Sequence, residues 1–159
     1  MKLSDKLKKE NIILSLKSQD KSSVIQELLN RLLDLNFLSA TVKLHTFIDK
    51  KDKLVNSAVG RGIAFHYSTS IEIDEQLAVL GVSQNGVNYD APDGQPVHFI
   101  LLILDTNEQC DLHRKLITRF QHFINDVNFR SQIIDCTSEK EIMDLVVLWE
   151  EKHLLNEDF

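Results

Sequence analysis

The chain has 159 residues, of which 43% are hydrophobic and 26% charged, and this length and composition suit a globular protein with a buried core. Its formal net charge of −6 argues against non-specific binding to nucleic acid or to an anionic membrane, because both require a basic surface. The longest apolar run, residues 99–104, is too short to cross a bilayer, and the charged N-terminus has no apolar signal-peptide core. We therefore expect a cytoplasmic protein without membrane insertion.

Apolar residues recur at spacings that predict strands alternating with helices. In chain order, the predicted elements are a strand at residues 12–16, helices at 23–35 and 41–51, strands at 63–65, 77–82 and 97–104, a long helix at 112–127 and a final helix from residue 138. Two helix starts carry a capping-box pattern, Ser23 with Gln26 and Ser138 with Glu141. The sequence Ala-Pro-Asp-Gly at residues 91–94 predicts a turn, since Pro presets φ and Gly accepts positive φ.

The segment at residues 97–104 is almost entirely apolar, which is typical of a strand buried on both faces in the middle of a sheet. Strands and helices that alternate around such a strand predict an α/β domain built in layers. No linker, repeat or low-complexity tract divides the chain, so we expect residues 1–159 to form a single domain. The pattern leaves the order of the strands open.

Two of the six histidines are candidates for chemistry. His66 follows the short apolar segment 63–65, at a strand end, where α/β domains usually place their sites. His113 lies near the start of the long helix, at the edge of its apolar stripe. From spacing alone a structural role is favoured for both, because two histidines make no metal site without a third ligand. The same role is strongly favoured for the other four, His45, His98, His122 and His153.

Other chemical signatures are weak. Gly60-Arg61-Gly62 begins like a dinucleotide-binding fingerprint, but Phe65 stands at the third glycine position. Cys110 and Cys136 form neither a disulfide framework nor a metal-binding pair, and two reduced thiols are the favoured interpretation. The residues alone therefore predict a globular α/β domain and no specific activity.

Three separated segments nevertheless resemble a known family. The sequence VGRGIAFH at residues 59–66 is similar to the active-site segment IGxGIAIPH of enzyme IIA domains of the bacterial phosphoenolpyruvate-dependent phosphotransferase system, in the fructose, mannitol and nitrogen-regulatory class. NYDAPDGQPV at residues 88–97, with the apolar run that follows, resembles the turn and central strand of that family. HRKLI at residues 113–117 resembles its second-histidine helix, and the resemblance extends over residues 3–148.

This resemblance implies a three-layer sandwich in which helices flank a mixed, mostly parallel sheet of about five strands. It also implies a phosphohistidine carrier that needs no cofactor and no metal. In the family, the first histidine accepts a phosphoryl group from HPr or its nitrogen-branch counterpart. The group then passes to a IIB domain, or the phosphorylation state regulates other proteins. Transferred to the matching positions of this chain, the resemblance makes His66 the acceptor and His113 its supporting histidine. It also implies that Lys51 and Ser57 stabilise the phosphate. Lys51 and Asp52 stand where the family has an Arg-Glu pair.

The active-site segment departs from the family pattern at its end. Counted from Gly60, His66 comes one residue early, and Phe65 stands in place of the preceding proline. A missing residue at a strand end can turn a side chain to the other face of the sheet, or a loop can absorb it. The absence of an attached IIB or IIC segment favours the nitrogen-regulatory type. The alternatives are a sugar-specific IIA component that donates to a IIB domain, and a degenerate regulatory module that binds a partner without being phosphorylated.

Overall fold

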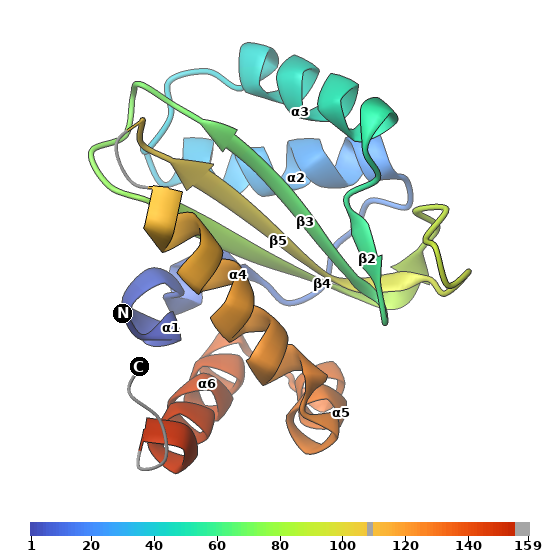
Figure 1. Cartoon of the computed structure of the whole chain (residues 1–159), viewed down its shortest axis with the longest axis vertical. Helices are drawn as coiled ribbons and strands as arrows, with labels where there is room; N and C mark the ends of the chain where they lie inside the picture. The colour runs from blue at the N-terminus through green and yellow to red at the C-terminus, as the bar shows by residue number, and fades with distance from the viewer. Residues whose placement is uncertain (108–109, 155–159) are drawn as a thin grey trace.

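Five strands of the described residues, 1–107 and 110–154, form one sheet in the order β1-β4-β5-β3-β2 in the computed structural model of the chain (Figure 1). The strands are β1 (Ile12–Ile13), β2 (Ala58–Gly60), β3 (Ile63–Thr69), β4 (Leu77–Val87) and β5 (Val97–Asp105). β1 pairs with β4 and β3 with β5 in parallel, whereas β4 with β5 and β2 with β3 are antiparallel. The predicted mixed sheet of about five strands is confirmed, and β5 lies at its centre.

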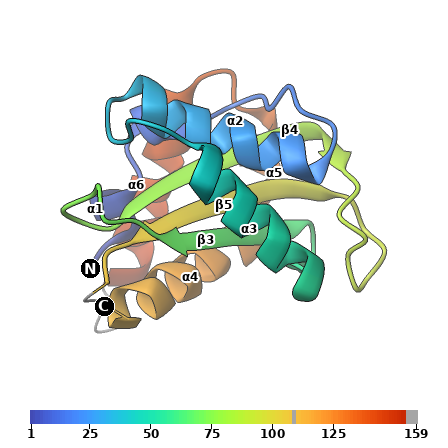
Figure 2. The same ribbon diagram turned by 90° about the horizontal axis from the view of Figure 1, so that it is seen from above.

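Helices cover both faces of the sheet and complete the predicted three-layer sandwich (Figures 1 and 2). They are α1 (Leu3–Lys6), α2 (Lys21–Asp34), α3 (Val42–Leu54), α4 (Cys110–Asn125), α5 (Val127–Asp135) and α6 (Glu139–Leu154). α2 and α3 pack on one face, and α1, α4, α5 and α6 belong to the core of the other. Among the described residues, no helix is both long and apolar enough to pass through a bilayer.

β5 supplies side chains to both cores because successive side chains of a strand point to opposite faces. Phe99, Leu101 and Ile103 belong to the core under α4 and α6. Ile100 and Leu102 belong to the core under α2 and α3. All five are buried, and full burial of one such side chain contributes about 1.5–3 kcal/mol to stability. The unbroken apolar run is thus explained by burial on both faces of the strand.

One of the two predicted capping patterns is found at its helix start, and the other is not. The N-cap of α2 is Asp20, whose carboxylate accepts a hydrogen bond from the backbone N–H of Ser23 at 2.9 Å. The long helix predicted at residues 112–127 ends at Asn125, and Asp126 caps a new helix, α5. Ser138 precedes α6 as predicted, and its hydroxyl accepts from the backbone N–H of Glu141 at 3.2 Å. Polar residues that bond to helix N–H groups thus override the apolar pattern at these ends.

The structure contains the predicted turn and one of the two predicted reduced thiols. The turn at residues 91–94 is present, with the N–H of Gly94 donating to the carbonyl of Ala91 at 2.9 Å and Gly94 at φ 71°. Cys136 carries a free thiol, whose pKa burial raises. The side chain of Cys110 lies outside the part of the chain that the structure describes.

Candidate functional site

β3 is longer than predicted, and its register decides which side chains share a face. It pairs with β5 residue by residue, from Ile63 beside Phe99 to Thr69 beside Asp105. His66 therefore lies in the middle of a strand, and the prediction that it follows a strand end is wrong. The polar residues after Phe65 end the apolar pattern but not the pairing, because β5 supplies hydrogen bonds along the whole segment.

Neighbouring side chains of β3 face opposite layers of the sandwich. Phe65 packs against Phe120 of α4, with ring centroids 5.8 Å apart, and Tyr67 faces the same layer. His66 points to the other layer, where it meets Tyr89 under α2 and α3. The structure therefore places His66 and Tyr67 on different faces of one strand.

The imidazole of His66 is enclosed. Only 2% of the residue is exposed, and its Nε2 lies 2.9 Å from the hydroxyl of Tyr89, which is fully buried. Burial lowers the pKa of His66 to about 4, and it raises the pKa of Tyr89. Both groups are therefore neutral near neutral pH, and their hydrogen bond occupies Nε2.

Asp52 and Ser57 lie beside this buried pair. Asp52 forms an ion pair with Lys21 at 2.7 Å and accepts a hydrogen bond from the backbone N–H of Ser57 at 2.9 Å. Burial alone would raise the pKa of Asp52, but the hydrogen bonds from Lys21 and Ser57 outweigh it and hold that pKa below its usual range. Ser57 lines a cavity of about 220 Å³ together with His66 and Lys51. Of the predicted phosphate-stabilising residues, Ser57 thus lies on the side of His66.

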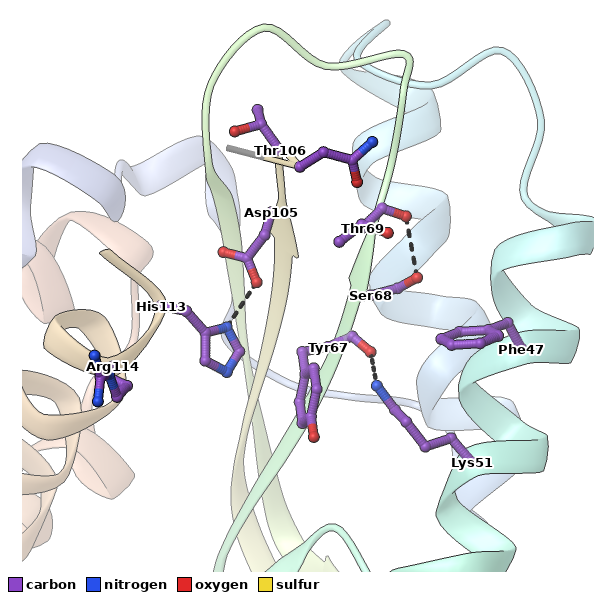
Figure 3. Close-up of a pocket in the computed structure, with 10 residues that line it drawn as sticks. Phe47, Lys51, Tyr67, Ser68, Thr69, Asp105, Thr106, His113 and Arg114 are labelled. Carbon is purple, nitrogen blue, oxygen red and sulfur yellow. Dashed lines mark hydrogen bonds and ion pairs between the residues drawn. The ribbon is translucent and has the colours of Figure 1, made fainter. Parts of the chain in front are cut away.

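A larger pocket of about 530 Å³ lies at the carboxyl ends of β3 and β5, on the other side of Tyr67 (Figure 3). We call it the β3–β5 pocket, and its lining includes Phe47, Lys51, Tyr67, Thr69, Asp105 and His113. These residues come from α3, β3, β5 and α4. The carboxyl ends of strands are where α/β sheets usually hold their ligands.

His113 is held in the β3–β5 pocket by a chain of two hydrogen bonds. Its Nδ1 lies 2.6 Å from Oδ2 of Asp105, and Oδ1 of Asp105 accepts from the side-chain amide of Gln76 at 2.8 Å. Because a carboxylate only accepts hydrogen bonds, Nδ1 of His113 carries the proton. The edge of the imidazole also contacts the ring of Tyr67, with centroids 4.8 Å apart and planes at 69°.

Lys51 enters the β3–β5 pocket from the last turn of α3. Its ammonium group lies 3.3 Å from the centroid of the Tyr67 ring and donates to the backbone carbonyl of Tyr67 (Figure 3). Burial lowers the pKa of Lys51, and the charge of Asp105 partly offsets that effect. The structure thus brings together two of the predicted site residues, Lys51 and His113, in the β3–β5 pocket. Lys51 also lines the smaller cavity beside His66, whereas His113 lines only the larger of the two.

Tyr67 is the site residue that the sequence analysis missed. β3 pairs with β5 residue by residue from Ile63 to Thr69, and this regular pairing favours an alignment with the motif that has no gap before His66. Counted without a gap from Gly60, the motif's proline position falls on His66 and its histidine position on Tyr67. This count was available from the sequence, and the regular strand register favours it over a gap.

Comparisons with known proteins agree on one family. The family model described as "Phosphoenolpyruvate-dependent sugar phosphotransferase system, EIIA 2" matches residues 5–147. The chain is 26% identical over 146 residues to the "PTS system fructose-specific EIIABC component" of Bacillus subtilis, covering 92% of this chain but only 23% of that protein. The chain thus spans about a quarter of that relative's length.

Solved structures of IIA proteins share the fold. The nitrogen regulatory protein IIA-Ntr of Neisseria meningitidis superposes with a TM-score of 0.80 at 18% identity, over 91% of this chain and 98% of that one. The Escherichia coli complex of enzyme IIAMTL and phosphorylated enzyme IIBMTL gives a TM-score of 0.74 at 20% identity, over 89% of this chain and 97% of that one. At these identities the match concerns the fold.

Proposed function

Because the chain belongs to the EIIA 2 family of the phosphoenolpyruvate-dependent sugar phosphotransferase system, we propose that it carries a phosphoryl group between proteins of that system. The proposed donor is HPr or its nitrogen-branch counterpart. The proposed receiver is a IIB domain or a regulatory target, and the IIAMTL–IIBMTL complex of the same fold supports a IIB-type partner. We further propose that residues 1–159 act as one cytoplasmic IIA domain, of the nitrogen-regulatory type or, alternatively, sugar-specific.

The observation that carries this proposal is the combination of groups in the β3–β5 pocket. Phosphoryl transfer needs a positioned nucleophile and stabilisation of charge on the transferred oxygens. His113 supplies an imidazole that Asp105 orients, and Lys51 supplies a partly desolvated cation. Phe47 and Tyr67, exposed by 55% and 43%, form an apolar rim on which a partner protein can exclude water from a labile phosphohistidine.

The position of the acceptor is a separate question. The family resemblance predicts His66 as the acceptor, with His113 in support, and this assignment stays a prediction. Attack by Nε2 of His66 requires that the ring first leave the hydroxyl of Tyr89 and become accessible to a partner.

The test of the carrier function is incubation with phosphoenolpyruvate, enzyme I and HPr, followed by intact-mass measurement. We expect one added phosphoryl group that is lost on acid treatment, because phosphohistidine is acid-labile, and no addition when enzyme I is omitted. The nitrogen-branch carrier replaces HPr in a parallel reaction. If the folded chain gains no phosphoryl group from either carrier, the proposed function is wrong.

One observation favours a second function, a regulatory module that binds a partner without phosphorylation. Counted without a gap from Gly60, Tyr67 takes the position of the motif's histidine, and the regular pairing of β3 with β5 supports that count. In that case HPr and a IIB domain would bind the unphosphorylated chain, as isothermal titration calorimetry can measure, while its mass stays unchanged in the transfer assay. A mass gain of one phosphoryl group excludes this alternative.

A further inference from the structure

We propose that Nε2 of His113 accepts the phosphoryl group in this chain, and that neither His66 nor Tyr67 does. This inference rests on the carrier function proposed above and deepens it by naming the reacting atom. It is carried by the different surroundings of the three candidate side chains, of which Tyr67 and His113 lie in the β3–β5 pocket and His66 on the other face of β3.

His66 is poorly placed to act as a nucleophile. Only 2% of the residue is exposed, at the wall of the cavity of about 220 Å³, and its Nε2 is already 2.9 Å from the buried hydroxyl of Tyr89. It also faces away from the layer that holds His113. A donor protein docked over the β3–β5 pocket therefore meets other groups first.

Tyr67 is accessible, but no base is hydrogen-bonded to its hydroxyl among the described residues. A neutral phenol must lose its proton to attack phosphorus, and the carboxylate in the pocket, Asp105, is already bonded to His113 and Gln76. No hydrogen bond joins the Tyr67 hydroxyl to another of the described residues. The ring of Tyr67 instead packs between two side chains: the ammonium group of Lys51 lies 3.3 Å from its centroid, and the imidazole of His113 contacts it.

His113 has the arrangement of an oriented nucleophile. Gln76 holds Asp105, and Asp105 holds the Nδ1–H edge of the imidazole, so the lone pair is left on Nε2. Figure 3 shows Nε2 on the side of the ring away from Asp105. The side chain is 20% exposed at the wall of the pocket, and Nε2 has no hydrogen-bond partner among the described residues. A histidine whose Nδ1 is held by a carboxylate is the arrangement that activates Nε2 in other catalytic sites.

The proposed step is a balanced transfer from a phosphohistidine of the donor protein. The Nε2 lone pair of His113 forms the new P–N bond, and the P–N bond to the donor imidazole breaks, returning its electron pair to that ring. The proton on Nδ1 of His113 stays in place, so the product ring carries a positive charge that Asp105 offsets. Lys51 provides a second cation for the phosphoryl oxygens.

The test is transfer from phosphorylated HPr to the full chain, with the modified residue located by peptide fragmentation at neutral pH. In wild type we expect the phosphoryl group on His113, and in His113→Gln we expect its loss. His122→Gln is the matched control, because His122 lies on the exposed face of the same helix. The double variant His66→Leu/Tyr89→Phe removes both partners of the buried hydrogen bond together and should still be phosphorylated.

The outcomes separate this inference from the carrier function itself. A phosphoryl group located on His66, or an acid-stable one on Tyr67, overturns the assignment to His113 and leaves the carrier function intact. Undiminished phosphorylation of a folded His113→Gln chain does the same. A wild-type chain that takes no phosphoryl group from any carrier overturns the proposed function, and the assignment with it.

Discussion

The family resemblance assigns His66 and His113 to one site, but their surroundings in the molecule differ. His66 is buried and hydrogen-bonded to Tyr89, whereas His113 lies in the β3–β5 pocket, hydrogen-bonded to Asp105. A buried, neutral ring stabilises the fold through its hydrogen bond, whereas an accessible, oriented ring can react. The difference follows from the alternation of side chains along β3.

The buried imidazole predicts a pH dependence of stability. The pKa of His66 falls from 6.5 to about 4 on folding, so between these values the unfolded chain binds a proton that the folded chain does not. The contribution of neutral, buried His66 to the free energy of unfolding is complete above the pKa of the unfolded chain, and it is lost as the pH falls toward the pKa of the folded chain. Between about pH 7 and about pH 5 we expect the free energy of unfolding to drop by about 2 kcal/mol more in wild type than in His66→Leu/Tyr89→Phe.

Urea titrations of both proteins at the two pH values measure this difference. Because the remaining titrating groups are the same in both chains, their contributions cancel. An equal pH dependence in the two proteins would show that His66 is protonated as readily in the folded chain as in the unfolded one.

The face occupied by His66 was beyond prediction from the sequence. A shift of one residue turns a strand's side chains to the opposite face, and the residues around His66 are compatible with either a gap or a continuous strand. The neighbour that settles the register is β5, more than thirty residues away in the chain. Lys51 and His113, by contrast, were predicted as site residues from the family resemblance, and the structure brings them to one pocket.

At the level of elements, prediction worked where burial dominates. The helical spacing of Val24, Ile25, Leu28 and Leu29 predicted α2, and the apolar run predicted β5, because each presents its apolar residues to a core. The split between α4 and α5 was missed, since the apolar stripe continues past Asn125 to Val127. There the side chain of Asp126 accepts hydrogen bonds from two backbone N–H groups and begins a new helix.

We expect Asp126→Ala to destabilise the chain through the loss of this cap. The carboxylate accepts from the N–H groups of Asn128 and Phe129, at 3.0 and 3.4 Å. Removal of an N-cap acceptor costs about 1 kcal/mol of unfolding free energy, which chemical denaturation resolves. Asp144→Ala serves as the control, because its exposed pair with Lys140 is expected to contribute less than about 0.5 kcal/mol. Equal effects of both substitutions would argue that the cap does not hold α5.

At the scale of the whole molecule, an aromatic cluster joins the sheet to the helices behind it. Phe65 of β3 packs edge-on against Phe120 of α4, and Phe123 of the same helix contacts Trp149 of α6 with centroids 5.6 Å apart. These contacts fix the distance between α4 and β3, and hence the place of His113 beside Tyr67.

Truncation of this cluster should be costly. Phe120 is fully buried, and we expect Phe120→Ala to lower the free energy of unfolding by about 3–5 kcal/mol, because the lost side chain leaves a cavity. Val127→Ala, at a residue that is 69% exposed, should change it by less than about 0.5 kcal/mol. Denaturation curves of both variants measure the difference, and a loss below about 1 kcal/mol for Phe120→Ala would mean that the cluster is loosely packed.

The hydrogen bond between Lys51 and the carbonyl of Tyr67 also bears on how copies of this chain behave in a crowded solution. β2 pairs with β3 as far as Ala64, and the N–H of Phe65 still donates to the carbonyl of Ser57. Beyond Phe65, no strand of the described residues pairs with β3 on this side of the sheet. Open edges invite strand addition by other chains, and a lysine placed on the edge is one of the ways in which proteins prevent it. We therefore expect Lys51 to hinder strand addition at this edge, at the same place where it supplies charge to the pocket.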